Sequence, residues 1–182
     1  MSRNTLSRSL HDLGLAAWFG GTLANAVALN PAAAQGATDT ATGAVANTGW
    51  DRWTPVNAAA IAAHTAGSLG QLRGNSGRIL GQQGVGSMVL VKTGLTVAAI
   101  GVTAYSRALG RKVSEQTEVP ASSGTDPAEA TPAEVAQAQR QLSILQWVVP
   151  GLTGALVVVS AFAGEQQRAS EASRGLVRRL LP

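Results

Sequence analysis

The feature that most restricts the fold of this chain is a long apolar segment in its last quarter. Residues 143–164, SILQWVVPGLTGALVVVSAFAG, contain no Asp, Glu, Lys or Arg. About 20 consecutive apolar residues form a helix long enough to cross the hydrocarbon core of a bilayer. Of the 182 residues, 45% are hydrophobic and 13% are charged, which is an unusual balance for a water-soluble domain. The sequence therefore predicts an all-α integral membrane protein.

Three further segments predict a bundle of about four transmembrane helices. Residues 85–108 form an apolar run that is interrupted by Lys92 and closed by Tyr105 and Arg107, and residues 11–30 form a first apolar run after a basic start. Residues 55–72 are the weakest candidate, because alanine barely favours lipid and the segment carries several polar side chains. We expect neighbouring helices to shield this segment from lipid.

Small residues within these spans predict close helix packing. In the first span they recur at short helical intervals, which lets two helix backbones approach each other. The expected packing positions are Gly14, Gly21, Ala24, Gly67 and Gly151. A duplication of the first span in the third is the alternative explanation for their similar Gly and Ala patterns.

The polar segments complete the predicted organisation. It consists of a basic cytoplasmic N-terminus (1–10), three transmembrane helices with connecting loops (11–110), a flexible acidic Pro-rich linker (111–131), a long fourth helix (132–164) whose transmembrane part is 143–164, and a basic amphipathic tail (165–182). Within residues 11–110, the Gly-rich segment 30–49 is expected to form a plain loop. Thr131 and Glu134 are expected to form a capping box at the start of the fourth helix.

Basic residues predict the orientation. With four spans, the positive-inside rule favours both termini in the cytoplasm of a bacterium, although the basic residues 111 and 112 would then lie outside. In the tail, Arg174, Arg178 and Arg179 are expected to meet anionic lipid headgroups. A disordered basic tail is the alternative.

The N-terminal region also allows a second interpretation. Two arginines, an apolar run and PAAAQ match the pattern of a secretory signal peptide, which would give a processed protein anchored by its last span. The apolar run is longer and richer in glycine than most signal peptides. We therefore expect it to be retained as the first span.

Motifs for catalysis or cofactor binding are not convincing. GQQGVGSMVLVKT lacks the glycine that a phosphate-binding loop needs directly before its lysine. The chain has no cysteine, which excludes disulfides and thiolate metal sites, and its basic groups lack the interleaved aromatics of a nucleic-acid surface. We predict no enzymatic activity, no cofactor, no metal and no nucleic-acid partner.

One candidate polar site remains, formed by His64 and Lys92. At 1.5 Å per residue these side chains lie about 12 Å and about 10 Å from the inner ends of their spans, so both reach one layer of the membrane. His11 is expected nearer the inner surface, which argues against a haem held by both histidines. A neutral His64 beside Lys92 would serve either to hold two helices together or to bind a proton or ligand.

The motif HDLGLAAWFGG, residues 11–21, resembles the first helix of small four-helix membrane families such as the copper-resistance D type. That resemblance implies a four-helix membrane fold with histidines and methionines for metal. Here Met88 is the only methionine besides the first residue. The Ala, Gly and Val bias is also similar to that of actinobacterial membrane proteins, which include accessory subunits of respiratory assemblies.

The sequence thus favours a non-enzymatic accessory or scaffold subunit of a larger membrane complex, with a respiratory complex as the candidate. Its expected partners are membrane lipids and other integral membrane subunits. The alternative is a small carrier, or an ion- or proton-binding protein, that uses His64 and Lys92.

Overall fold

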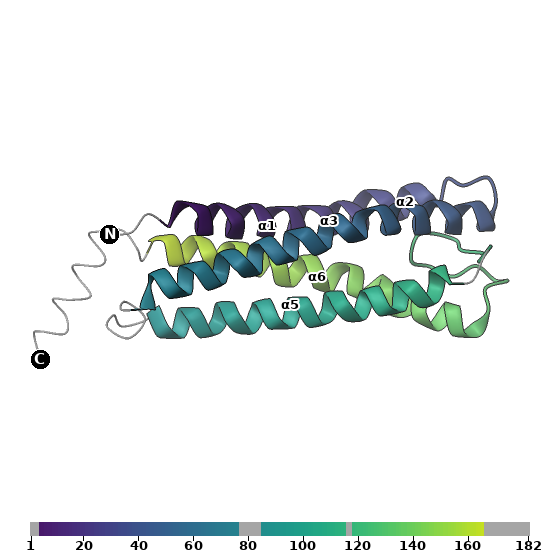
Figure 1. The fold of residues 1–182 in the computed structure, drawn as a ribbon. Coiled ribbons are helices and arrows are strands. Elements are labelled where there is room, and N and C mark those ends of the chain that lie inside the picture. The colour runs from purple at the N-terminus through teal and green to yellow at the C-terminus, as the bar shows by residue number, and fades with distance from the viewer. Residues whose placement is uncertain (1–3, 77–84, 116–117, 166–182) are drawn as a thin grey trace, which may run out of the picture.

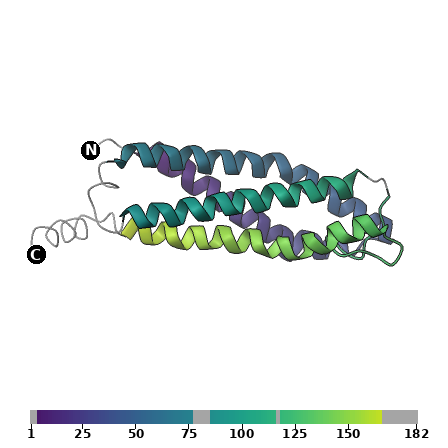
Figure 2. The same ribbon diagram turned by 90° about the horizontal axis from the view of Figure 1, so that it is seen from below.

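The described residues of the chain fold into a bundle of four long helices. The computed structural model describes residues 4–76, 85–115 and 118–165. The long helices are α1 (Thr5–Ala24), α3 (Asp39–Gly74), α5 (Val85–Ser114) and α6 (Ala133–Glu165). A π-helical turn, η1 (Asn25–Leu29), and a short helix, α2 (Asn30–Ala33), extend α1. Figures 1 and 2 show the four long helices running side by side.

The helices alternate in direction along the chain. The start of α1, the end of α3, the start of α5 and the end of α6 lie at one end of the bundle (Figures 1 and 2). The turn that joins α2 to α3 and the segment 118–132 lie at the opposite end, which we call the loop end. The four long helices therefore alternate in direction, so that the start of α1 and the end of α6 lie at the same end of the bundle.

The bundle is built from two helix pairs. α1 packs along α3, α5 packs along α6, and α1 also packs on α6, whereas α3 and α5 touch each other little. Trp18 on α1 is fully buried where the pairs meet. The buried core around it comes from all four helices and comprises Leu15, Ala60, Ala99, Val149 and Leu156.

Glycine allows α1 and α3 to approach each other closely. A Cβ atom on Gly14 would overlap the backbone of His64, and one on Gly67 would overlap the backbone of His11. At Gly21 a Cβ atom would overlap the ring of Trp53. Two other predicted packing positions differ, because Ala24 is exposed and the space around Gly151 is open.

Two segments expected to be loops are more ordered than the sequence suggests. α3 begins at Asp39, so much of the predicted Gly-rich loop is helical, and the Thr38 hydroxyl accepts a hydrogen bond from the Ala41 N–H at 3.1 Å. This contact is a helix N-cap, which stabilises the first turn.

The expected flexible linker is likewise folded where the structure describes it. The Ala121 N–H donates to the carbonyl of Asp39 at 3.0 Å, and the Gly124 N–H donates to the carbonyl of Asn30 at 3.1 Å. The Thr131 hydroxyl, expected to cap the fourth helix, donates to the carbonyl of Pro120 at 2.6 Å. Backbone hydrogen bonds to the helix ends thus hold this acidic segment in place.

Two of the described helices are suited to a membrane. Gly86–Ser114 and Ala133–Glu165 are long and apolar enough to cross a bilayer, by length and composition. In the described residues α1 and α3 do not qualify, because their apolar content is diluted by small and polar side chains. The prediction of four transmembrane helices therefore holds in part: the fold is an all-helical bundle with two candidate spans.

The glycine contacts make a direct prediction about stability. Gly14→Ala and Gly67→Ala should each lower the free energy of unfolding by about 1–3 kcal/mol, because the added methyl group meets backbone that cannot move aside. Gly20→Ala on α1 is the matched control, since a Cβ atom there meets nothing within 4 Å. This control should be neutral or slightly stabilising, because alanine favours helix over glycine. Thermal unfolding in detergent followed by circular dichroism measures the difference, and equal stability of all three variants would contradict the contact.

Candidate functional site

Three polar side chains from three helices meet inside the bundle. His11 lies on α1, His64 on α3 and Lys92 on α5. Both histidines are among the largest fully buried side chains of the described chain, and Lys92 is half-buried. Buried ionisable groups are costly unless they are paired, so their meeting at one place requires a physical explanation.

The two histidines reach the same level because of a reciprocal crossing. Each is followed three residues later by a glycine, as His11 with Gly14 and His64 with Gly67. In the antiparallel pair α1 and α3, Gly14 lies against the backbone of His64, and Gly67 lies against the backbone of His11. The two imidazole rings consequently face each other with their centroids 4.5 Å apart.

Lys92 and Asp12 fix the state of the His11 ring. The Lys92 Nζ lies 3.2 Å from His11 Nε2, and His11 Nδ1 lies 2.7 Å from Asp12 Oδ1. An ammonium group can only donate, so Nε2 must accept, and the ring proton belongs on Nδ1, which donates to the carboxylate. His11 is then a neutral imidazole that connects a cation to an anion.

His64 is held on the other side of His11. Its Nδ1 lies 3.3 Å from the backbone carbonyl of His11, and its Nε2 lies 3.5 Å from the hydroxyl of Thr96 on α5. Since a carbonyl can only accept, the proton of His64 belongs on Nδ1. The ring also packs edge-on toward Trp18, with centroids 6.1 Å apart. The second imidazole thus carries a proton on Nδ1, and its Nε2 faces a hydroxyl that can either donate or accept.

The structure changes the pairing expected from the sequence. The hydrogen-bond partner of Lys92 is His11, and His64 lies beside that pair rather than on the lysine. The expected difference in depth between the two histidines is wrong, because the tilt and offset of α1 against α3 bring both rings to one level. With the rings in direct contact, this arrangement leaves no room for a porphyrin between them.

The arrangement can carry a proton but shows little capacity for a metal. Lys92, His11 and Asp12 form a continuous chain of hydrogen-bonding groups, and the Asp12 side chain is 72% exposed. A neutral imidazole can accept a proton on one nitrogen while it releases one from the other. Among the described residues there is no cluster of three or more His, Cys, Asp or Glu side chains that could hold a metal ion.

A second polar centre, at the loop end, was not predicted from the sequence. Asn30 is buried, its amide donates to Gln146 Oε1 at 2.7 Å, and its carbonyl oxygen Oδ1 accepts from Trp50 Nε1 at 2.9 Å. Asn30 thereby joins α2, α3 and α6. Its only sequence signal is a single Asn-Pro step, which also suits an ordinary turn.

The predicted lipid-contact residues Arg174, Arg178 and Arg179 lie outside the described residues. Comparison of the chain with protein-family models, curated proteins and solved structures found no match in any of the three. The similarity to the copper-resistance D type therefore rests on residues 11–21 alone.

The contacts of His64 predict how it tolerates substitution. His64→Ala should lower the free energy of unfolding by roughly 2 kcal/mol or more, because it removes a packed ring and leaves the hydroxyl of Thr96 without a partner. His64→Gln should cost less, since glutamine retains a donor and an acceptor. Unfolding in detergent measures both, and unchanged stability in the alanine variant would show that the ring does not pack as described.

Proposed function

We propose that this chain is an integral membrane protein that serves as a non-enzymatic accessory or scaffold subunit of a larger membrane complex. The observation that supports the proposal is that the apolar surface of α5 and α6 lies mostly on the outside of the bundle. Only 6% of the most apolar window of α5, and 22% of that of α6, is buried inside the bundle. The core helix of a water-soluble protein buries most of its apolar residues, because exposing them to water is unfavourable.

Large apolar side chains therefore cover the outside of the molecule. Leu90 on α5 is 74% exposed, Val97 on the same helix is 64% exposed, and Phe162 on α6 is 62% exposed. Many large apolar side chains exposed on two helices are typical of membrane contact or of an interface between proteins. Lipid and partner helices together would solvate it.

Open glycines support the presence of partner helices. At Gly94 and Gly101 on α5, and at Gly151 on α6, an added Cβ atom would meet nothing within 4 Å. Glycine weakens a helix by roughly 0.5–1 kcal/mol relative to alanine. In membranes, small residues at helix surfaces are enriched where another helix packs closely. The partners proposed from the sequence are other integral membrane subunits, with a respiratory complex as the candidate.

The proposed topology has four passes with both termini in the cytoplasm of a bacterium. The even number of helix crossings supports termini on one side. α1 and α3, which are the less apolar helices, would be shielded by lipid-facing α5 and α6 and by partner subunits. Most of the basic residues assigned to the cytoplasmic side lie outside the described residues.

The second candidate function is a small proton- or ion-binding carrier. The meeting of Lys92, His11 and His64 at one buried site favours it, since buried ionisable groups within a membrane region are often functional. A carrier would act without a large complex. It would also lose activity with His64→Gln, a change that a scaffold should tolerate.

Copurification tests the scaffold proposal. The chain extracted in a mild detergent should migrate with a complex much larger than itself, and Gly101→Leu should release it because the leucine blocks close helix contact. Gly20→Leu is the matched control, since Gly20 is also open but lies on α1. Blue native electrophoresis gives the size. A chain that migrates alone as wild type, with transport activity lost in His64→Gln, would favour the carrier.

Site-directed labelling tests the topology. Cysteines introduced at Ser2 and at Ser123 should react with a membrane-impermeant maleimide from opposite sides, because an odd number of passes separates them. The wild-type chain has no cysteine, so any signal comes from the introduced residue. Ser123 lies in the folded segment at the loop end, whereas Ser2 lies outside the described residues. Labelling of both positions from one side would overturn the four-pass topology.

A further inference from the structure

The two helix pairs leave a cavity between them near the loop end. Its volume is about 240 Å³, and it is lined mainly by α3, α5 and α6. Apolar cavities of roughly 150 Å³ bind a molecule the size of benzene. The cavity is therefore large enough for a longer hydrocarbon segment.

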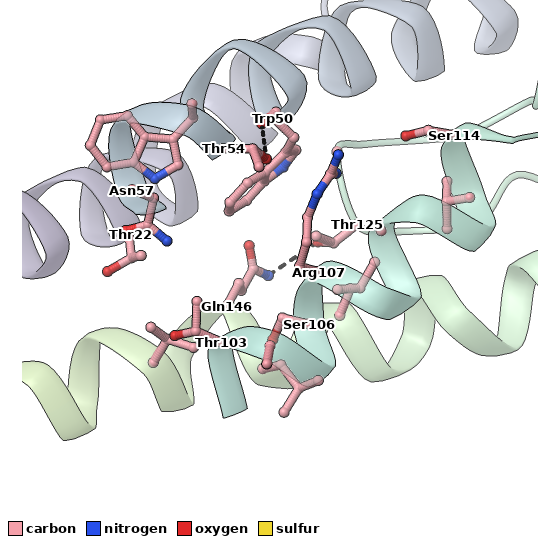
Figure 3. A pocket seen from close by; sticks show the side chains of 18 of the residues that line it. Thr22, Trp50, Thr54, Asn57, Thr103, Ser106, Arg107, Ser114, Thr125 and Gln146 are labelled. Atoms are coloured by element: carbon pink, nitrogen blue, oxygen red, sulfur yellow. Dashed lines mark hydrogen bonds between the residues drawn. The ribbon is translucent and has the colours of Figure 1, made fainter. Parts of the chain in front are cut away.

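The lining of the cavity combines apolar side chains with polar ones. Ile61, Ile100 and Val149 contribute apolar surface at the deep end, where Asn57 and Thr103 also lie, and Arg107 is the charged side chain among the lining residues. Figure 3 shows Arg107 on α5 extending beside Trp50 of α3, with Gln146 and Thr125 below it. A ligand that fits this lining has an apolar chain and a polar head that lies near Arg107.

The cavity extends along the second half of α5. From Ile100 to Ser114 its lining on this helix extends about 21 Å at 1.5 Å per residue. One leaflet is about half of the ~30 Å hydrocarbon core of a bilayer. Arg111 and Lys112 lie within this stretch, as expected where a span enters the headgroup region, so the cavity would extend from one leaflet into that region.

The cavity opens sideways between α3 and α5. Ala58 on α3 and Ala104 on α5 line the cavity and are also exposed at the molecular surface. The candidate span Gly86–Ser114 forms one edge of this opening. A lipid chain can therefore enter from the bilayer without passing through water.

Polar atoms without partners mark the cavity wall. Within the described part of the chain, four buried polar atoms that lack a hydrogen-bond partner belong to residues lining the cavity: Trp53 Nε1, Asn57 Oδ1, Thr103 Oγ1 and Arg107 Nε. Most buried polar groups in proteins are hydrogen-bonded. Three of these four atoms can donate, so they suit the carbonyl and phosphate oxygens of a ligand.

We propose that this cavity binds one phospholipid, with an acyl chain between α3 and α5 and its ester or phosphate oxygens accepting from Arg107. This assignment rests on the proposed membrane location. The guanidinium of Arg107 donates from Nη2 to Asp51 Oδ1 at 3.1 Å. This ion pair holds the Arg107 side chain at the mouth, and its Nε has no hydrogen-bond partner in the described residues. The lipid would fill the space between two helices that touch little and so join the two helix pairs.

The test uses the full chain in nanodiscs of phosphatidylglycerol and phosphatidylcholine, with lipid retention measured by native mass spectrometry. The wild-type protein should retain one phospholipid. Ala104→Trp should abolish retention by filling the mouth. Ala108→Trp, one turn further along the exposed side of α5, should retain the lipid. Equal retention by both variants would overturn the proposal.

A second set of variants serves if Ala104→Trp does not fold. Arg107→Met should reduce the ratio of lipid-bound to free protein about tenfold, equivalent to one hydrogen bond to a charged group. Arg111→Met is the control for loss of one positive charge on the same helix, and it should retain the lipid. An equal loss of retention in Arg111→Met and Arg107→Met would overturn the role of Arg107.

The outcomes separate this inference from the proposed function. Release of the chain from membranes by alkaline carbonate would overturn the membrane location. A chain that stays in the membrane but retains no phospholipid would overturn only the cavity assignment. Recovery of a different molecule, such as an isoprenoid quinone, from the freshly purified protein would also overturn the phospholipid.

Discussion

The close crossing of α1 and α3 is the constraint on which the rest of the structure depends. Gly14 and Gly67 allow each helix to lie against the backbone of a histidine on the other. This approach brings the rings of His11 and His64 together, and His11 also accepts from Lys92. One geometric feature thus provides both a close contact of two helix backbones and the site where the half-buried lysine finds its partner.

The bundle places its polar groups inside and much of its apolar surface outside. Buried His11, Asn30 and Gln139 contrast with exposed Leu90 and Phe162. In water this arrangement would be unfavourable on both counts, because apolar groups would be exposed and polar groups would be desolvated. In a bilayer the contact of the apolar outer surface with lipid is favourable. The interior polar groups then hold the helices together, because the hydrophobic effect contributes little to helix association in lipid.

The sequence predicted the helices better than their contacts. The apolar segments identify α5 and α6 because length and absence of charge are local properties. The start of α3 was missed, although Thr38 followed by Asp39 is a typical N-cap signal, because the Gly-rich composition around it favours a loop. The pairing of Lys92 with His11 depends on how far α1 shifts along α3, which residue spacing within a single helix does not specify. The shared His-x-x-Gly pattern is the one sequence signal for it.

The close glycine contacts and the cavity lie at different helix interfaces. Gly14, Gly21 and Gly67 are used between α1 and α3, whereas Gly94 and Gly101 on α5 face open space. Between α3 and α5 the cavity is lined by large side chains such as Trp50, Ile61 and Ile100, with the small Ala58 and Ala104 at its opening. The bundle thus has one tight helix pair and one loose interface. In our proposals, the loose interface binds a lipid and the open glycines contact a partner helix.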